Sequence, residues 1–238
     1  MNRAHRFFPG LASAAGCAAL TAVGTLAMLS TPEALAEGAF GQLYASRPPA
    51  GSSFVRVINP GTAPLRVKIA SGPEQTLKGD VVASSYAIVK GQTEFVVTIN
   101  GKASAPLTVA PDSFTSLMPS SPTNATQLKV LDDSAGAPQD ALKAGLRFYN
   151  LSADCNEGAV GIAPAGTPLF SPVAYGATTA RAINPVKARL VGRCAQVDTA
   201  TLELPALQPG EHFSLFLMGS ASQPVLRGQR SSTDGYKP

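Results

Sequence analysis

Few residues of this 238-residue chain could do chemistry, and one histidine is central among them. His212 is the only histidine beyond the first five residues. A Ser-His-Asp triad needs such a base beside a serine, and residues distant in sequence can meet in a fold. No G-x-S-x-G motif, which would expose a serine on a strained turn, occurs in the chain. The sequence therefore contains one candidate base but predicts no catalytic residue.

A second candidate for chemistry is the segment Pro111-Asp112-Ser113-Phe114. It is similar to the Gly-Asp-Ser block of lipase-like acetyl-transfer enzymes. The glycine of that block is missing, however, and no aspartate stands three residues before His212. We therefore interpret Asp112 as a turn residue, and we expect His212 to be a surface group at the edge of a strand.

Metal, nucleotide and nucleic-acid sites are not indicated. One histidine, a pair of cysteines and scattered carboxylates form no cluster of metal ligands. Neither a Walker A motif nor G-x-G-x-x-G occurs. The basic and acidic residues are interspersed, which argues against binding of nucleic acid. We expect no cofactor.

The first 36 residues have the features of a secretory signal peptide. A basic start is followed by an apolar run over residues 11–29, and Ala34-Leu35-Ala36 fits a cleavage site before Glu37. An uncleaved membrane anchor is the alternative, because the apolar run approaches spanning length. A lipoprotein site at Cys17 is a third interpretation. Cleavage would leave 17 Lys and Arg against 14 Asp and Glu, since Arg3, Arg6 and Glu33 are lost from totals of 19 and 15.

Beyond the leader the chain has two cysteines, Cys155 and Cys194. Two cysteines in an exported protein usually pair, because the compartment is oxidising. Their separation of 39 residues corresponds to about 3–4 kcal/mol of stabilisation in the chain-entropy model. A reactive thiol pair or a metal site is the alternative, but the spacing and the missing histidines favour a structural disulfide.

Arginines and lysines alternate along several predicted strands. Alternation could gather them on one sheet face as a shallow basic surface for carboxylates of a polymer or a partner. The simpler interpretation is the ordinary solvated face of an antiparallel sheet. The candidate contact residues are Arg56, Arg66, Lys68, Arg147, Arg181, Lys187 and Arg189.

The composition and patterning predict an all-β protein. Gly and Pro number 22 and 20, Trp is absent, and short apolar runs recur at intervals typical of a β-sandwich. Phe54 to Asn59 alternates in the manner of a strand and ends at a turn signal. We predict two tandem small β-sandwich (Ig-like) domains. Their expected bounds are 37–131 and 144–222, with a linker over 132–143 and a polar C-terminal tail over 223–238.

The second half of the chain repeats the first at domain scale. Asn150 follows Asn59 by 91 residues, and Gly192 follows Gly101 by the same interval. The strands that close the two halves, 114–118 and 213–217, differ by 99 residues. These offsets predict a duplicated domain whose second copy carries extra residues.

Two segments closely resemble the alginate biosynthesis protein family AlgF. They are Gln42 to Ala45 followed by Pro49 to Asn59, and Ala180 to Lys187 in the second half. The disulfide and the linker are not parts of that pattern. The resemblance implies a periplasmic protein needed for O-acetylation of the exopolysaccharide alginate, which bears acetyl groups on the 2- and 3-hydroxyls of mannuronate in biofilm-forming bacteria.

The family pattern supplies no catalytic residue, so the resemblance implies an adaptor. Its partners would be the membrane acyltransferase and the periplasmic proteins that transfer acetyl groups, and it would meet the membrane only through them. Two alternatives remain. The protein could be a glycan-binding module that holds the polyanion, or an acetyl carrier or transferase that uses a serine with His212.

Overall fold

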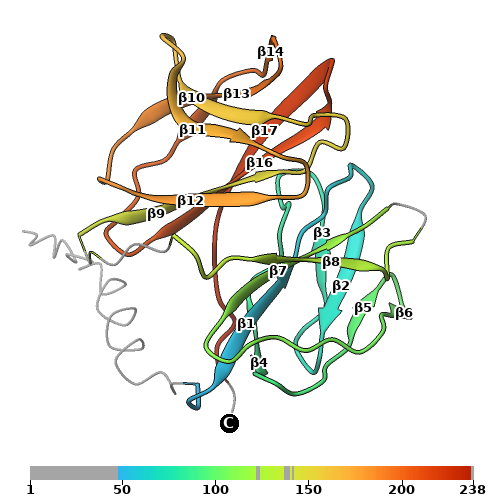
Figure 1. Ribbon diagram of the computed structural model, residues 1–238. Coiled ribbons are helices and arrows are strands. Elements are labelled where there is room, and N and C mark those ends of the chain that lie inside the picture. The colour runs from blue at the N-terminus through green and yellow to red at the C-terminus, as the bar shows by residue number, and fades with distance from the viewer. Residues whose placement is uncertain (1–47, 122–123, 137–139, 141, 237–238) are drawn as a thin grey trace, which may run out of the picture. The chain divides into compact units, whose positions relative to one another are not determined.

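The computed structural model describes residues 48–121, 124–136, 140 and 142–236, and every regular element in these ranges is a β-strand (Figure 1). The predicted all-β fold with two tandem sandwich domains is confirmed. In the described part of the chain, no helix is long and apolar enough to cross a membrane. The predicted signal peptide lies outside the described residues.

The first sandwich consists of two four-stranded sheets, ordered β4-β1-β7-β8 and β3-β2-β5-β6. Alternate residues of β1 point to opposite faces, so Val55 and Val57 are fully buried in the core that both sheets share. The strands are β1 (Ser52–Val57), β2 (Leu65–Ile69), β3 (Gln75–Leu77), β4 (Ala87–Lys90), β5 (Val97–Ile99), β6 (Lys102–Ala103), β7 (Phe114–Pro119) and β8 (Leu128–Asp132).

The second sandwich has the same plan. One sheet is ordered β12-β9-β16-β17, and the other is ordered β11-β10-β13-β14 with β15 also paired to β13. Leu146 and Phe148 of β9 are buried in the shared core. The strands are β9 (Ala144–Asn150), β10 (Gly158–Ile162), β11 (Thr167–Val173), β12 (Thr178–Ile183), β13 (Ala188–Cys194), β14 (Val197–Asp198), β15 (Leu202–Leu204), β16 (His212–Ser220) and β17 (Gln223–Arg230).

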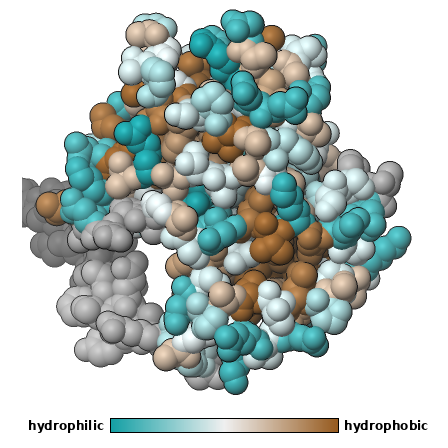
Figure 2. Space-filling view, in the orientation of Figure 1, coloured by the Kyte–Doolittle hydropathy of each residue, from teal (hydrophilic) through white to brown (hydrophobic). Residues whose placement is uncertain are grey.

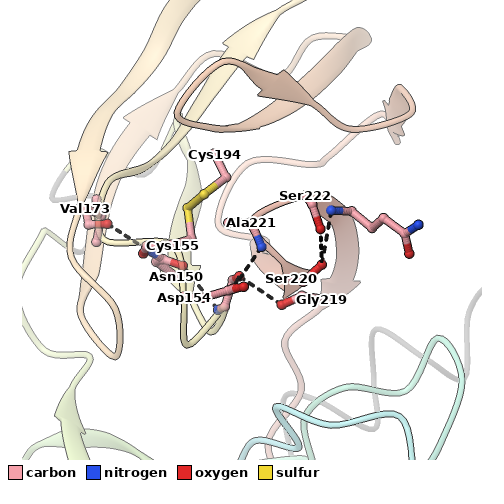
Figure 3. The surroundings of a disulfide bond; sticks show 11 residues. Asn150, Asp154, Cys155, Val173, Cys194, Gly219, Ser220, Ala221 and Ser222 are labelled. Atoms are coloured by element: carbon pink, nitrogen blue, oxygen red, sulfur yellow. Dashed lines mark hydrogen bonds between the residues drawn. A yellow bond between two sulfur atoms is a disulfide. The ribbon is translucent and has the colours of Figure 1, made fainter.

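The predicted disulfide is present. Cys155 and Cys194 are bonded with their Cα atoms 5.7 Å apart, and both are buried in the core of the second sandwich (Figure 3). Cys155 lies in the turn that precedes β10, and Cys194 ends β13. The bond therefore ties that turn to the central strand of the five-stranded sheet.

The repeat is visible as equivalent hydrogen bonds around two asparagines. The side chain of Asn59 accepts from the N–H of Gly61 at 3.0 Å and donates to the carbonyl oxygens of residues 63 and 77. Asn150 accepts from the N–H of Ser152 at 3.2 Å and donates to the carbonyl oxygens of residues 155 and 173. The 91-residue offset therefore holds for these strands.

The closing strands shift by 98 residues rather than 99. β1 pairs in parallel with β7 so that Arg56 lies beside Ser116, and β9 pairs in parallel with β16 so that Arg147 lies beside Ser214. The predicted alignment of Phe114 with Phe213 is therefore wrong by one residue. A shift of one residue exchanges the two faces of a strand, so these two side chains point to opposite faces of their sheets. His212 is the true counterpart of Phe114.

The predicted polar tail is wrong for residues 223–230, which form strand β17 along the whole of β16. Leu226 is buried in the core, and Gly228 leaves room for the ring of Phe213, which a Cβ there would meet at 2.6 Å. The segment looks polar because the face of β17 that points away from the core carries polar side chains, and these bond to the first sandwich. Gln229 accepts from the N–H groups of residues 82 and 83, both at 2.9 Å.

The two sandwiches pack against each other through their β1-containing and β9-containing sheets. The outward face of each sheet contributes apolar side chains to a third buried cluster. We call this contact the junction, and its apolar part comprises Ile58, Val82, Ala83, Met118, Leu131, Tyr149, Leu151, Phe216 and Met218. A sheet that packs on both faces explains the near-continuous burial of β7 and β16.

Candidate functional site

The most unusual residue of the junction is Arg56, whose side chain is 1% exposed. Its Nε donates to the hydroxyl of Ser116 at 2.9 Å, and Nη1 donates to Ser231 at 3.2 Å. Nη2 donates to the hydroxyls of Tyr149 at 2.6 Å and Ser214 at 2.9 Å. Three of these acceptors belong to the second sandwich, so one guanidinium group holds both sandwiches together.

Aromatic rings and one carboxylate complete the surroundings of Arg56. Its guanidinium carbon lies 4.5 Å from the ring centroid of Tyr86 and 5.4 Å from that of Tyr149, within cation–π range. Burial alone disfavours the charge, but Tyr149, Tyr86 and Asp133 outweigh it and raise the pKa of Arg56. The arginine is therefore charged in the interior.

Asp133 is the counter-ion of this network. Its Oδ2 lies 3.9 Å from Arg56 Nε and accepts the hydroxyl protons of Tyr86 and Ser116, while Oδ1 accepts that of Tyr149 at 2.7 Å. Burial raises the pKa of Tyr149 to about 12, although Arg56 opposes the shift. Both tyrosines therefore remain protonated donors near pH 7, and the three hydroxyls satisfy the carboxylate.

Arg147 is the repeat counterpart of Arg56, but its contacts are fewer. Nη2 donates to the carbonyl oxygens of Asp133 and Ala135, both at 2.5 Å. Nε lies 3.8 Å from Asp133 Oδ1, which is beyond hydrogen-bond distance. The side chain is 12% exposed and faces a cavity.

This cavity, which we call the junction cavity, has a volume of about 300 Å³. It is lined by residues of both sandwiches, and members of the Arg56 network form part of its wall. Aromatic rings, hydroxyls and both arginines face it. Its lining residues are Arg56, Tyr86, Phe114, Asp133, Gly145, Arg147, His212, Phe213, Ser214, Ser231, Ser232 and Thr233.

His212 lies at the rim of the junction cavity, at the first position of β16. Partial burial, and then the charges of Arg147 and Arg56, lower its pKa. Its imidazole is therefore neutral near pH 7. In the described part of the chain, no serine hydroxyl or carboxylate is hydrogen-bonded to this ring. Asp112, the other candidate, accepts from the N–H of Gly51 at 3.2 Å in a turn, as predicted.

The predicted basic surface is divided among separate places. Arg56 is buried, and Arg147 faces the junction cavity. Arg66 and Lys68 are exposed on β2, which belongs to a different sheet from β1. The others are exposed in the second sandwich: Arg181 on β12, Lys187 in the loop before β13, and Arg189 on β13.

Sequence reasoning missed Asp133 and the serines of the junction. One signal was available, since Arg56 and Arg147 occupy matching places in the repeat. That match indicates a paired role for the two arginines. The serines carry no such signal, because a hydroxyl on a strand is usually solvated.

Among the described residues, no group of three His, Cys, Asp or Glu side chains could hold a metal ion.

Comparison with known proteins decides the family. A sequence profile described as "Alginate O-acetyl transferase AlgF" matches residues 26–213. The chain belongs to the AlgF family. It is 28% identical over 185 residues to the alginate biosynthesis protein AlgF of Pseudomonas putida KT2440, covering 78% of this chain and 81% of that protein.

Two solved domains of AlgF from P. aeruginosa also match this AlgF-family chain. The C-terminal domain is 26% identical, with a TM-score of 0.33, and covers 37% of this chain and 98% of its own. The N-terminal domain is 22% identical, with a TM-score of 0.29, and covers 36% and 98% respectively. Membership places the protein in a family associated with alginate O-acetylation, and its disulfide is typical of an oxidising compartment.

Proposed function

We propose that this protein is a periplasmic adaptor for O-acetylation of alginate. It joins a membrane acyltransferase to the periplasmic proteins that deliver acetyl groups to the 2- and 3-hydroxyls of mannuronate. Family membership supports the pathway. The adaptor role is supported by the way in which the two sandwiches are joined.

The junction carries the proposal. Two sandwiches linked by a short segment would ordinarily move relative to each other. Here a buried apolar cluster and three hydrogen bonds of Arg56, to Ser231, Tyr149 and Ser214, hold them face to face. A partner bound to one sandwich is therefore kept in a fixed position relative to a partner bound to the other, which is what an adaptor requires.

Each sandwich offers an edge strand for such partners. β8 ends one sheet of the first sandwich and carries Val130, which is 54% exposed, while β17 ends a sheet of the second and carries Val225. Figure 2 shows apolar side chains gathered on the first sandwich, over the region of β8 and β2 in Figure 1. An open edge with apolar side chains suits the addition of a partner strand.

The periplasmic location rests on two observations. The disulfide of the second sandwich forms readily only in an oxidising compartment, and the first 36 residues match a secretory signal. We infer that the protein meets the membrane only through its partners.

Affinity capture tests the adaptor. Tagged residues 37–238 are incubated with detergent-solubilised envelope, and we expect the membrane acyltransferase and its periplasmic partners to be retained. Val130→Lys and Val225→Lys form a matched pair, because each charges one exposed edge without touching a core. Each variant should lose a different partner. Capture of no acetylation protein by the unmodified chain would reject the adaptor.

One observation favours a second candidate, an acetyl carrier. His212 is a neutral base in a cavity that also contains the hydroxyls of Ser231 and Ser232. A serine there could attack an acetyl ester or thioester donor if the imidazole took its proton and then passed it to the donor's leaving group. The test is acetylation of alginate by a strain carrying His212→Ala. Retained acetylation would end this candidate, while loss of acetylation with folding and partner capture intact would support it.

A further inference from the structure

The junction cavity has an excess of positive charge. Arg56 and Arg147 contribute two guanidinium groups, Asp133 contributes one carboxylate, and His212 is neutral near pH 7. The net charge of the lining is therefore +1. A positive charge held away from bulk water favours an anion beside it, because its own solvation is incomplete.

Arg147 carries N–H donors that no described residue accepts. Both protons of Nη2 are used by the linker carbonyls, and the oxygens of Asp133 are occupied by three hydroxyls. Among the described residues, no acceptor is hydrogen-bonded to Nε or Nη1 of Arg147. One side of the guanidinium is thus anchored while other donors remain available. A planar group fixed in this way is prepared to bind a carboxylate.

The walls of the cavity suit a ring with hydroxyl groups. Phe114 is 37% exposed, and its ring is held by stacking on Phe54 at a centroid distance of 4.5 Å. The lining also includes Ser232 and Thr233, which are exposed and carry hydroxyl groups. A volume of about 300 Å³ is at the lower end of ligand pockets, so the cavity would hold a small ligand rather than a long segment of chain.

We propose that the junction cavity binds the carboxylate of a single sugar acid, with Arg147 donating to the carboxylate and Phe114 packing against the sugar ring. The preference for a carboxylate follows from the charge and the free donors. The choice of a sugar acid, a uronate, also rests on the proposed function in alginate O-acetylation. The cavity would bind one sugar residue. It differs in this from a flat basic sheet face, along which a polymer would lie.

The test is a titration of residues 37–238, which include the whole compact unit formed by residues 45–238. The probes are D-mannuronate, acetate and the uncharged sugar D-mannose, followed by calorimetry and by amide NMR shifts. Mannuronate should shift the amides of Gly145, Arg147 and Ser232. Acetate should bind about fivefold or more weakly, because it lacks the ring contacts, and mannose should not bind.

Two variants form a matched pair. Arg147→Gln should weaken mannuronate binding about tenfold or more, since it removes a charged donor. Arg66→Gln removes an exposed cation outside the cavity and should leave binding unchanged. If Arg147→Gln does not fold, which its amide spectrum would reveal, the map of shifts on the unmodified protein still decides the location of the site.

Three results with the sugar and acetate probes would overturn the proposal. The first is that mannuronate does not bind at concentrations up to about 50 mM. The second is that acetate and mannuronate bind with equal affinity. The third is that the amide shifts are confined to residues outside the cavity. Tighter binding of a blocked diaspartate peptide would overturn it in favour of an acidic protein partner. Capture of acetylation proteins needs no sugar, so failure of the cavity proposal leaves the adaptor intact, and the reverse also holds.

Discussion

Arg56 and Arg147 occupy the same position in the two sandwiches, yet Arg56 is fixed by its hydrogen bonds in the interior, whereas Arg147 is partly exposed in the junction cavity. Each lies on the first strand of its repeat, beside a serine of the parallel closing strand. Arg56 uses all three of its nitrogens in hydrogen bonds, whereas Arg147 is anchored only through Nη2. Duplication thus produced two arginines with different tasks.

The difference arises from the residues next to them. Two residues before each arginine pair, the first sandwich has Phe54 stacked on Phe114, and the second has Gly145 beside His212. The first copy has two aromatic rings at this position, while the second copy has a glycine without a side chain at the cavity wall. A site can therefore arise in a duplicated fold when one copy has less bulk around a charge that both copies retain.

The largest effect that would test this comparison is loss of the buried arginine. Arg56→Met leaves Asp133 buried without its cation, so the free energy of unfolding should fall by about 3–5 kcal/mol. Arg147→Met should cost about 1 kcal/mol, because it breaks hydrogen bonds to carbonyls near the surface. Urea unfolding of both variants measures the difference. Equal losses would mean that the two arginines have the same structural role.

Next in size is the disulfide, which only the second sandwich has. Replacing Cys155 and Cys194 by serine should lower the free energy of unfolding by about 3–4 kcal/mol, through loss of the loop constraint. Hydrogen exchange of amides should locate the loss in β10 and β13. An unchanged melting temperature in reductant would contradict the prediction.

A smaller effect tests whether the two copies are equivalent at their asparagines. Asn59→Ala and Asn150→Ala each remove a side chain that satisfies one N–H and two carbonyl groups. We expect each to cost about 2 kcal/mol, because buried backbone groups lose their partners. Thermal unfolding provides the comparison. A loss at one position alone would show that the repeat is not equivalent in energy.

The smallest effect concerns His212, for which the first copy has Phe114. Its pKa is lower in the folded state than the ordinary value of about 6.5. The unfolded chain therefore binds the proton more readily, and stability should fall as the pH drops below about 6.5. His212→Gln should remove this part of the pH dependence. Urea midpoints between pH 5 and 8 measure it, and identical profiles would reject it.

The sequence was sufficient for the fold class, because alternation and turn signals are local properties of the chain. The disulfide was also predictable, since only two cysteines remain beyond the leader. The repeat could be found from Asn59 and Asn150, whose identical roles preserved the residue. Its closing strand was misaligned by one residue, because the apolar residues of β7 and β16 are continuous and give no period.

The candidate site was largely hidden from sequence reasoning. Arg56 looked like a solvated residue, because a charged side chain in an alternating strand usually faces water. What buries it is a second sheet more than ninety residues away, and no local pattern encodes that contact. The strand β17 was mistaken for a tail for a related reason. Gln229 is polar because it satisfies backbone groups of the first sandwich.

Residues 231–234, which follow β17, return to the first sandwich. Tyr86 forms a parallel bridge with Thr233, and its N–H and carbonyl bond to residues 232 and 234 at 2.8 Å. The bond from Arg56 to Ser231 spans 175 residues. Because synthesis proceeds from the N-terminus, the first sandwich can collapse long before this contact exists. The junction is complete only when residues 231–234 are in place, and truncation before Ser231 would leave Arg56 short of a partner.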